Sequence, residues 1–379
     1  MIFKVKMKKI LFALICIALP FSAFFVALYD FGFLNKATLF SASLVMPEGA
    51  YSVATNDFFE NDMISDEVYS ILQNSQISDI SQPNLNISKG SDDELTKTPE
   101  DIAEYMNEYE GKKQSLSNDG TINEYQYSST QANTVSGSVW VQNKTDQKID
   151  IDQLLKDGAD LKIEDKAQPT ILIYHTHTTE SYQPLDCGFF SKSIASRNGN
   201  NALNVVRVGD EITKQLEKAG YKVIHDKNTY DTTYSGAYYR SEERVRKYLE
   251  EYPSIKITLD IHRDAINSST TMLKPTAVIN GKKAAQIMII SGCEENGVVN
   301  FPDWKYNLKF ALQLQKNMQE TFPGLCRPLF FCDRVYNMNV NHCSLLIEIG
   351  TNANTLDEAA YSGRLLGVSL GKMLENYVQ

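Results

Sequence analysis

The pattern of apolar and polar positions divides the chain into three parts. Residues 10–28 form an almost unbroken apolar run, close to the roughly 20 residues that an α-helix needs to cross a bilayer. Residues 74–138 are rich in Ser, Asn, Asp, Gln, Thr and Glu, and such a segment buries too little apolar surface to offset its ordering entropy. We therefore expect an anchor segment over residues 1–33, a flexible tether over residues 34–138 and a folded domain over residues 139–379.

Strand and helix patterns alternate within the expected domain. Short runs of large aliphatic side chains predict buried strands, and apolar residues at helical spacing predict amphipathic helices between them. The expected strands are 170–174, 221–225, 255–261, 285–290 and 345–349, and the expected helices are 149–155, 203–219, 239–252, 304–322 and 356–377. This alternation is typical of a three-layer α/β domain, in which helices flank a largely parallel central sheet.

The N-terminal lysines indicate which side of the membrane the domain occupies. Lys4, Lys6, Lys8 and Lys9 precede the apolar run, and lysines at the start of a spanning segment stay in the cytoplasm. The domain is therefore expected on the extracytoplasmic side of the cell membrane, behind a single-pass helix. A cleaved signal peptide is the alternative, but no small-x-small site directly follows the run.

Charge and cysteine content exclude two kinds of site. The formal net charge of −10 opposes nucleic-acid binding. The cysteines outside the apolar run are odd in number and form no C-x-x-C motif, so a zinc cluster made of cysteines is not expected.

Polar, metal-competent residues follow the ends of two expected strands. His175, His177 and Glu180 follow the first, and His262 ends the third, flanked by Asp260 and Asp264. The chain has only 5 histidines, and three of them lie at these two positions. Because the carboxyl ends of parallel strands meet at one edge of a sheet, we expect these side chains to lie close together.

This residue set suits a catalytic zinc ion. Zinc at such sites takes three nitrogen or oxygen ligands from the protein and leaves one position open. His177, Glu180 and His262 can supply them, with His175 as an alternate ligand, since residues two apart on a strand face the same way. Asp260 and Asp264 are expected to orient the ligands. Glu348 lies inside an apolar strand and is predicted to be the general base.

Several motifs, in one order along the chain, resemble the stage II sporulation protein P family. They include Ile-Leu-Ile-Tyr-His-Thr-His-Thr-Thr-Glu-Ser-Tyr, Leu-Asp-Ile-His-Arg-Asp-Ala and Leu-Leu-Ile-Glu-Ile-Gly-Thr-Asn-Ala-Asn-Thr. Shorter similar stretches are residues 204–210, 223–226 and 234–241. The resemblance extends from about residue 139 to the end, and the expected anchor agrees with it.

The resemblance implies an activity and a setting. The family is related to the third type of zinc-dependent N-acetylmuramoyl-L-alanine amidase, which implies hydrolysis of the bond between muramic acid and the stem peptide of peptidoglycan. It further implies endopeptidase action on peptide cross-links during engulfment in endospore formation. The implied partners are stage II sporulation proteins D and M.

The resemblance also assigns roles to residues. It makes His177, rather than His175, the first metal ligand, His262 a second ligand and Glu348 the catalytic glutamate. The wider amidase family carries its ligand glutamate where this chain has Asn200 and Asn201, so Glu180 is the nearest replacement. Tyr234, Tyr238 and Arg240 resemble substrate-groove residues or, alternatively, residues that cap and pack a helix; Arg240 is suited to a stem-peptide carboxylate.

Two other functions compete with the hydrolase. A degenerate amidase-fold protein would bind cell wall or partner proteins without hydrolysing anything, but such proteins usually lose a ligand or the base, and this chain keeps all of these residue types. A serine hydrolase is disfavoured because the chain has no G-x-S-x-G motif.

Overall fold

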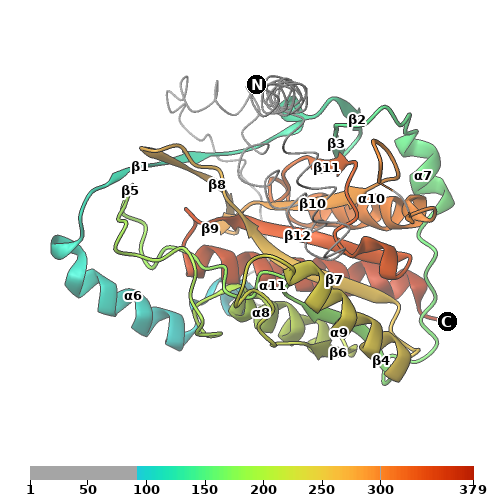
Figure 1. The fold of residues 1–379 in the computed structure, drawn as a ribbon, viewed down its shortest axis with the longest axis horizontal. Coiled ribbons are helices and arrows are strands. Elements are labelled where there is room, and N and C mark those ends of the chain that lie inside the picture. Colours follow the sequence, from blue (N-terminus) through green and yellow to red (C-terminus); the bar gives the residue numbers. More distant parts are fainter. Residues whose placement is uncertain (1–91, 299) are drawn as a thin grey trace, which may run out of the picture. The chain divides into compact units, whose positions relative to one another are not determined.

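The computed structural model describes residues 92–298 and 300–379 (Figure 1). The predicted membrane anchor and the first part of the predicted tether lie outside these residues. Within the described ranges, no helix is both long enough and apolar enough to cross a membrane.

The centre of the fold is a mixed, mostly parallel sheet flanked by helices, as the alternating pattern predicts. The pairs β2–β3 and β10–β12 are antiparallel, and the other neighbouring pairs are parallel. In spatial order the strands are β2 (Thr134–Ser136), β3 (Val139–Asn143), β11 (Leu329–Cys332), β10 (Ile287–Gly292), β12 (Cys343–Thr351), β7 (Ile257–Asp264), β4 (Pro169–Tyr174) and β6 (Lys222–His225).

The direction of β10 follows from what connects it to β7. Two parallel strands of one sheet need a long crossover, usually a helix. Here the intervening chain forms the hairpin of β8 (Thr271–Ile279) and β9 (Lys282–Ala285) instead. Without a crossover helix the chain returns through β10 antiparallel to its neighbour β12. The sequence pattern contains no helix at this point, but it does not predict the hairpin either.

Two long helices pack side by side against the sheet with almost no space between their backbones. These are α8 (Val205–Lys218) and α11 (Leu356–Leu374). A Cβ atom on Gly363 would lie 2.9 Å from the carbonyl oxygen of Val208, and one on Gly367 would lie 2.8 Å from that of Ile212. Both glycines are therefore required for this close packing.

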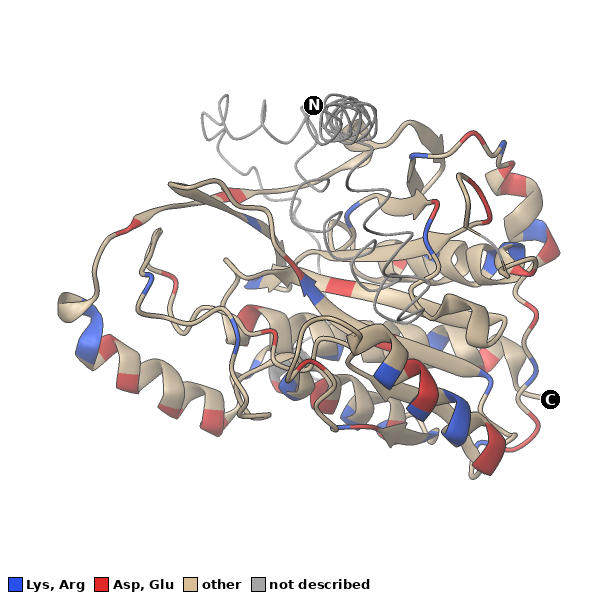
Figure 2. Ribbon diagram, viewed as in Figure 1, with Lys and Arg blue, Asp and Glu red and all other residues tan. Residues whose placement is uncertain are grey.

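Three further helices pack on the sheet or on other helices. Helix α10 (Trp304–Thr321) packs beside α11 and against β10, and α7 (Ile151–Asp157) packs on α10. Helix α9 (Ala237–Glu251) covers Leu172 and Tyr174 of β4 through Val245. Figure 2 shows positive and negative residues alternating along α9, which reflects the i,i+4 ion pairs Arg246–Glu242 and Lys247–Glu243.

Residues 92–138, which composition assigns to the tether, are folded. They form α5 (Asp92–Thr96), α6 (Glu100–Lys112), β1 (Gly120–Tyr125) and β2. Strand β1 pairs in parallel with β8, and β5 (Phe189–Phe190) joins its other edge, so a second sheet has the order β5-β1-β8-β9 (Figure 1). Pairing with β8 supplies the backbone hydrogen bonds and contacts that this polar segment lacks alone.

A buried lysine joins this second sheet to the rest of the domain. The side chain of Lys274 in β8 is 1% exposed, and its Nζ lies 2.7 Å from Glu358 of α11, 2.8 Å from Asp186 and 3.3 Å from Glu124 of β1. Burial opposes the charge of Lys274, but the carboxylates of Glu358 and Asp186 outweigh this, and the pKa of Lys274 is raised. Four separate segments are therefore held by one ammonium group.

We predict that Lys274→Ala strongly destabilises the domain, because it leaves the buried carboxylate of Glu358 without its cation. The expected loss in free energy of unfolding is about 3–5 kcal/mol, measured by urea denaturation. Lys283→Ala is the matched control: this lysine contacts the same Asp186 and Glu124, but its side chain is 44% exposed, so its loss should cost about 1 kcal/mol or less. Equal losses for the two variants would contradict the role given to Lys274.

Candidate active site

The turn after β4 is held in place by a buried aspartate of the neighbouring strand. β4 ends at Tyr174, opposite Asp260 of β7. The carboxylate of Asp260 is completely buried and accepts hydrogen bonds from the backbone N–H of Thr176 at 2.8 Å and from its hydroxyl at 2.6 Å. This anchors the turn that carries the next residue, His177, at the edge of the sheet.

His177, Glu180 and His262 lie together beyond the carboxyl ends of β4 and β7. The ring centroids of His177 and His262 are 5.4 Å apart, and Nδ1 of His262 lies 3.3 Å from Oε2 of Glu180. All three side chains are almost completely buried. The structure thus brings the three residues into one cluster, as an edge-of-sheet site requires.

Electrostatics within the cluster favour a cation. Burial opposes the ionisation of Glu180, but the Arg263 guanidinium and His262 outweigh it and hold the pKa of this carboxyl below its usual range. Burial also opposes protonation of His262. The carboxylates of Asp260 and Glu180 outweigh this effect of burial, so that the pKa of His262 is raised well above 6.5. Burial lowers the pKa of His177 to about 3, which leaves a neutral imidazole suited to metal binding.

One separation in the cluster is close to that between two zinc ligands. Ligand distances of about 2.0–2.2 Å in a tetrahedral site place neighbouring ligand atoms about 3.4 Å apart, near the 3.3 Å between His262 Nδ1 and Glu180. Nδ1 of His177 is buried and has no hydrogen-bond partner. Nε2 of His262 lies 2.9 Å from Asp260 in a poorly aligned contact, an orienting carboxylate of the kind common beside metal-bound histidines. Across the described residues, however, no group of three or more His, Cys, Asp or Glu side chains is arranged so that it could hold a metal ion.

Glu348 lies beside this cluster because β12 and β7 are paired in parallel. Its register partner is His262, so the two side chains project from the same face of the sheet. Burial, followed by the charge of Asp264, raises the pKa of Glu348 to about 8. Its Oε2 is buried and makes no hydrogen bond. A carboxyl group that has an oxygen without a hydrogen bond and a pKa near neutrality is suited to proton transfer.

Asp264 is held by an arginine rather than by a histidine. Its carboxylate lies 2.7 Å from Nη1 of Arg327, and both side chains are buried. The guanidinium of Arg327 also lies over the ring of Tyr127. Asp264 therefore acts on the site through its charge on Glu348.

His175 lies in a different network. The expectation that it faces the same way as His177 assumed a continuous strand, but the strand ends at Tyr174 and the following residues form a turn. Nδ1 of His175 contacts the carbonyl of Ile261 at 2.9 Å, and Nε2 contacts Nε2 of His225 at 2.8 Å. A Cβ atom on Gly209 would lie 2.8 Å from His175. With both ring nitrogens engaged, His175 is a poorer ligand than Glu180.

Tyr234 and Tyr238 pack against the two histidines. Tyr234 stacks on His177 with 4.6 Å between ring centroids and 1° between planes, and Tyr238 stacks on His262 at 6.3 Å. Tyr234 is 37% exposed, whereas Tyr238 packs inward against Tyr336.

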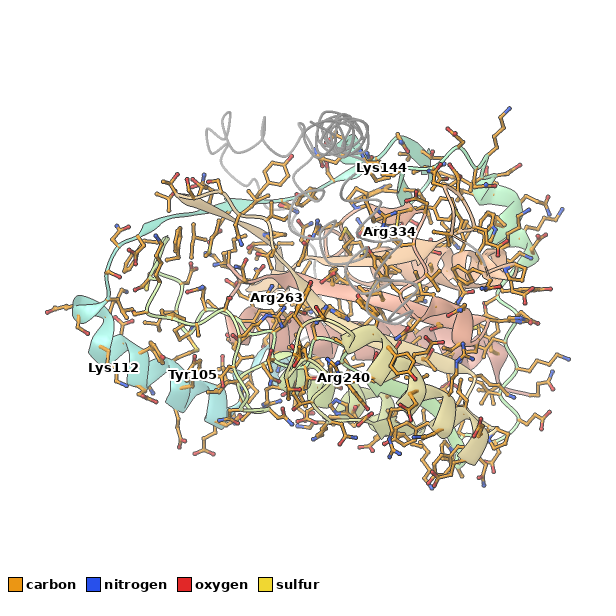
Figure 3. All side chains as sticks on the ribbon, viewed as in Figure 1. Tyr105, Lys112, Lys144, Arg240, Arg263 and Arg334 are labelled. Carbon is orange, nitrogen blue, oxygen red and sulfur yellow. The ribbon has the colours of Figure 1, made fainter. Side chains whose placement is uncertain are left out.

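Arg240, labelled in Figure 3, is committed to the backbone. It donates hydrogen bonds from Nε, Nη1 and Nη2 to the carbonyls of Tyr230, Ser235 and Thr233, respectively. Arg240 therefore fixes the loop that carries Tyr234. This agrees with the alternative that Arg240 packs and caps a helix, rather than with a role in carboxylate binding.

Two arginines of the site are missed by sequence reasoning. The backbone N–H of Arg263 donates to Glu180 at 3.2 Å, and its side chain donates to the carbonyls of Ser181 and Ser196. Nη2 of Arg197 lies 3.9 Å from Glu180. Arg263 is adjacent to His262 in the motif Leu-Asp-Ile-His-Arg-Asp-Ala and could have been found there, whereas nothing in the local sequence distinguishes Arg197.

Comparison with known proteins gives the family. Residues 63–370 match the model of stage II sporulation protein P (SpoIIP). The chain belongs to the SpoIIP family. This confirms the resemblance carried by the motifs, and the candidate site residues all lie within the matched range. The stage II sporulation protein P of Bacillus subtilis (strain 168) is 32% identical over 200 residues, which is 50% of this chain and about half (47%) of the relative.

Two solved structures similar to this chain are amidases. The CwlD amidase from Clostridioides difficile, solved in complex with the GerS lipoprotein, is 13% identical, with a TM-score of 0.33 over 55% of this chain and 99% of that one. The catalytic domain of CwlV, an N-acetylmuramoyl-L-alanine amidase from Bacillus (Paenibacillus) polymyxa var. colistinus, has the same four values. Likeness at this level says nothing about the reaction of the SpoIIP chain.

The raised pKa of Glu348 predicts how the stability of the metal-free protein depends on pH. The folded state holds the Glu348 proton up to about pH 8, whereas an ordinary glutamate loses it near 4.5. The folded state therefore binds more protons between these values, and its stability falls as pH rises through this window. Glu348→Gln has no such proton to lose. In urea denaturation with a chelator, wild type should lose stability relative to Glu348→Gln between pH 5 and pH 8, and a constant difference would contradict the shift.

Proposed function

We propose that this SpoIIP chain is a zinc-dependent N-acetylmuramoyl-L-alanine amidase that hydrolyses peptidoglycan on the extracytoplasmic side of the membrane. The observation that carries the proposal is the meeting of His177, Glu180 and His262 from two separate segments, next to the buried Glu348. Endopeptidase action on peptide cross-links is a further part of the proposal and rests on the resemblance to the family.

Different residues of the cluster bind the metal ion and orient its ligands. His177, Glu180 and His262 would hold the ion, which when bound supplies a Lewis acid for the amide carbonyl and lowers the pKa of water. Asp260 orients His262 through Nε2, and the Arg263 backbone orients Glu180.

Glu348 transfers the proton. Its carboxylate takes a proton from the attacking water and returns it to the leaving amine as the carbon–nitrogen bond breaks. The positive charge of the ion will favour the ionised form of Glu348, so the base should work below the pKa of about 8 that burial gives it in the metal-free protein.

The cellular setting is also a proposal. The N-terminal apolar run would anchor the protein in the cell membrane, where it would take part in septal wall remodelling and engulfment during endospore formation. Stage II sporulation proteins D and M are the proposed partners. A protein that binds cell wall without hydrolysis is the competing function, and the retained Glu348 argues against it.

We predict that Glu348→Gln abolishes hydrolysis while zinc binding persists, because the amide preserves shape but accepts no proton. Release of peptides from purified sacculi should fall at least about 100-fold, with unchanged zinc content by elemental analysis. Glu250→Gln, on the exposed side of α9, is the control for loss of one carboxylate and should keep full activity. Full activity of Glu348→Gln would reject the proposed base.

Metal content tests the ligands separately. His177→Ala and His262→Ala should each lower zinc affinity by at least about tenfold in a competition assay with a chromogenic chelator. His342→Ala, which removes a surface histidine paired with Asp160, should bind zinc like wild type. Chelator-treated wild type should be inactive and recover with zinc. Activity that persists in zinc-free protein would show that the cluster has another purpose.

A further inference from the structure

Arg197 is a partly exposed residue beside the candidate metal cluster. Its backbone forms an antiparallel bridge with Glu180, and the next residue, Asn198, donates its N–H to the carbonyl of Thr179. The Arg197 side chain is 38% exposed, in contrast to Glu180 at 8%. A cationic, solvent-accessible group is therefore attached directly to the segment that carries a predicted ligand.

The guanidinium of Arg197 is held in one orientation. Nη1 pairs with Asp231 at 2.6 Å and donates to the hydroxyl of Thr179 at 3.2 Å. The side chain of Asp231 is fully buried and also accepts from the backbone N–H of Thr179. The guanidinium carbon lies 5.2 Å from the ring centroid of Tyr234. A side chain held in this way loses little further entropy when it binds a ligand.

Part of this guanidinium is unused. A guanidinium has five N–H donors in a planar fork, and those of Nε and Nη2 of Arg197 make no hydrogen bond to any residue in the described ranges. Nη2 lies 3.9 Å from Oε1 of Glu180, beyond hydrogen-bond distance. Such a fork matches the geometry of a carboxylate.

The other arginines of the site have no comparable capacity. Arg240 uses all three side-chain nitrogens on backbone carbonyls. Arg263 and Arg327 are 6% exposed, and they bind backbone carbonyls and Asp264, respectively. Of these four, Arg197 alone combines exposure with unused donors.

We propose that Arg197 binds the free α-carboxylate of the second residue of the stem peptide, close to the scissile amide, so that the site selects peptides that carry this acid. The inference rests on the proposed function and adds a specificity determinant to it. Asp231 and Tyr234 act as positioning residues for the guanidinium. This moves the carboxylate-binding role from Arg240, where the sequence suggested it, to an arginine whose guanidinium lies over the ring of Tyr234.

The test uses a matched pair of ligands that differ only in charge. N-acetylmuramoyl-L-alanyl-D-glutamate carries a free α-carboxylate, and N-acetylmuramoyl-L-alanyl-D-isoglutamine carries an amide there. Binding to zinc-loaded Glu348→Gln protein is measured by calorimetry, which requires no hydrolysis and therefore stays informative if the proposed activity fails. Hydrolysis of the same pair by protein with Glu348 intact gives the kcat and KM of each.

We expect about 10- to 100-fold tighter binding of the carboxylate ligand and a lower KM for it. Adding Arg197→Gln should remove this preference without changing zinc content, and Arg197→Lys should restore part of it. Arg246→Gln, in an exposed ion pair on α9, is the control and should keep the preference. Equal binding of the two ligands, or an Arg197→Gln effect that is the same for both, would overturn the proposal and leave Arg197 a purely structural residue.

Discussion

The parallel pairing of β12 with β7 is the interaction on which the rest of the site depends. It sets Glu348 beside His262 in the register of the sheet, and a shift of one residue would turn one of them to the opposite face. The adjoining pairing of β7 with β4 brings Asp260 to the end of β4, where its carboxylate anchors the turn before His177. The predicted base, ligands and orienting acid thus derive their relative positions from backbone hydrogen bonds, which are rigid and exclude water.

Such an arrangement requires many charged groups to be buried, and each has a partner of opposite charge. Glu180 lies between His262 and Arg263, and Asp264 pairs with Arg327. Glu348 is the exception, since one of its oxygens makes no hydrogen bond. A buried, unsatisfied carboxyl group reduces stability, and its retention next to the histidines is consistent with a role in chemistry rather than in folding.

The N-terminal part of the described chain changes how the domain is understood. Residues 92–138 have a tether-like composition, yet β1 completes a second sheet and contributes Glu124 to the buried cluster around Lys274. That cluster also includes Glu358, which caps the first turn of α11. The segment between the predicted anchor and the site is therefore partly built into the domain that it was expected only to connect.

The sequence by itself determined the α/β class, five strands of the central sheet, most of the α-helices, and the candidates His177, His262 and Glu348, because periodic burial and strand-end polar residues are local signals. It could not determine the direction of β10, the folding of residues 92–138 or the separate network of His175, since each depends on which segment pairs with which. The arginines show the same limit of the sequence. From the sequence alone, Arg240 and Arg197 are equally plausible carboxylate-binding residues. Only the tertiary structure shows that Arg240 donates its side-chain hydrogen bonds to backbone carbonyls, whereas Arg197 has N–H donors that are not used in this way.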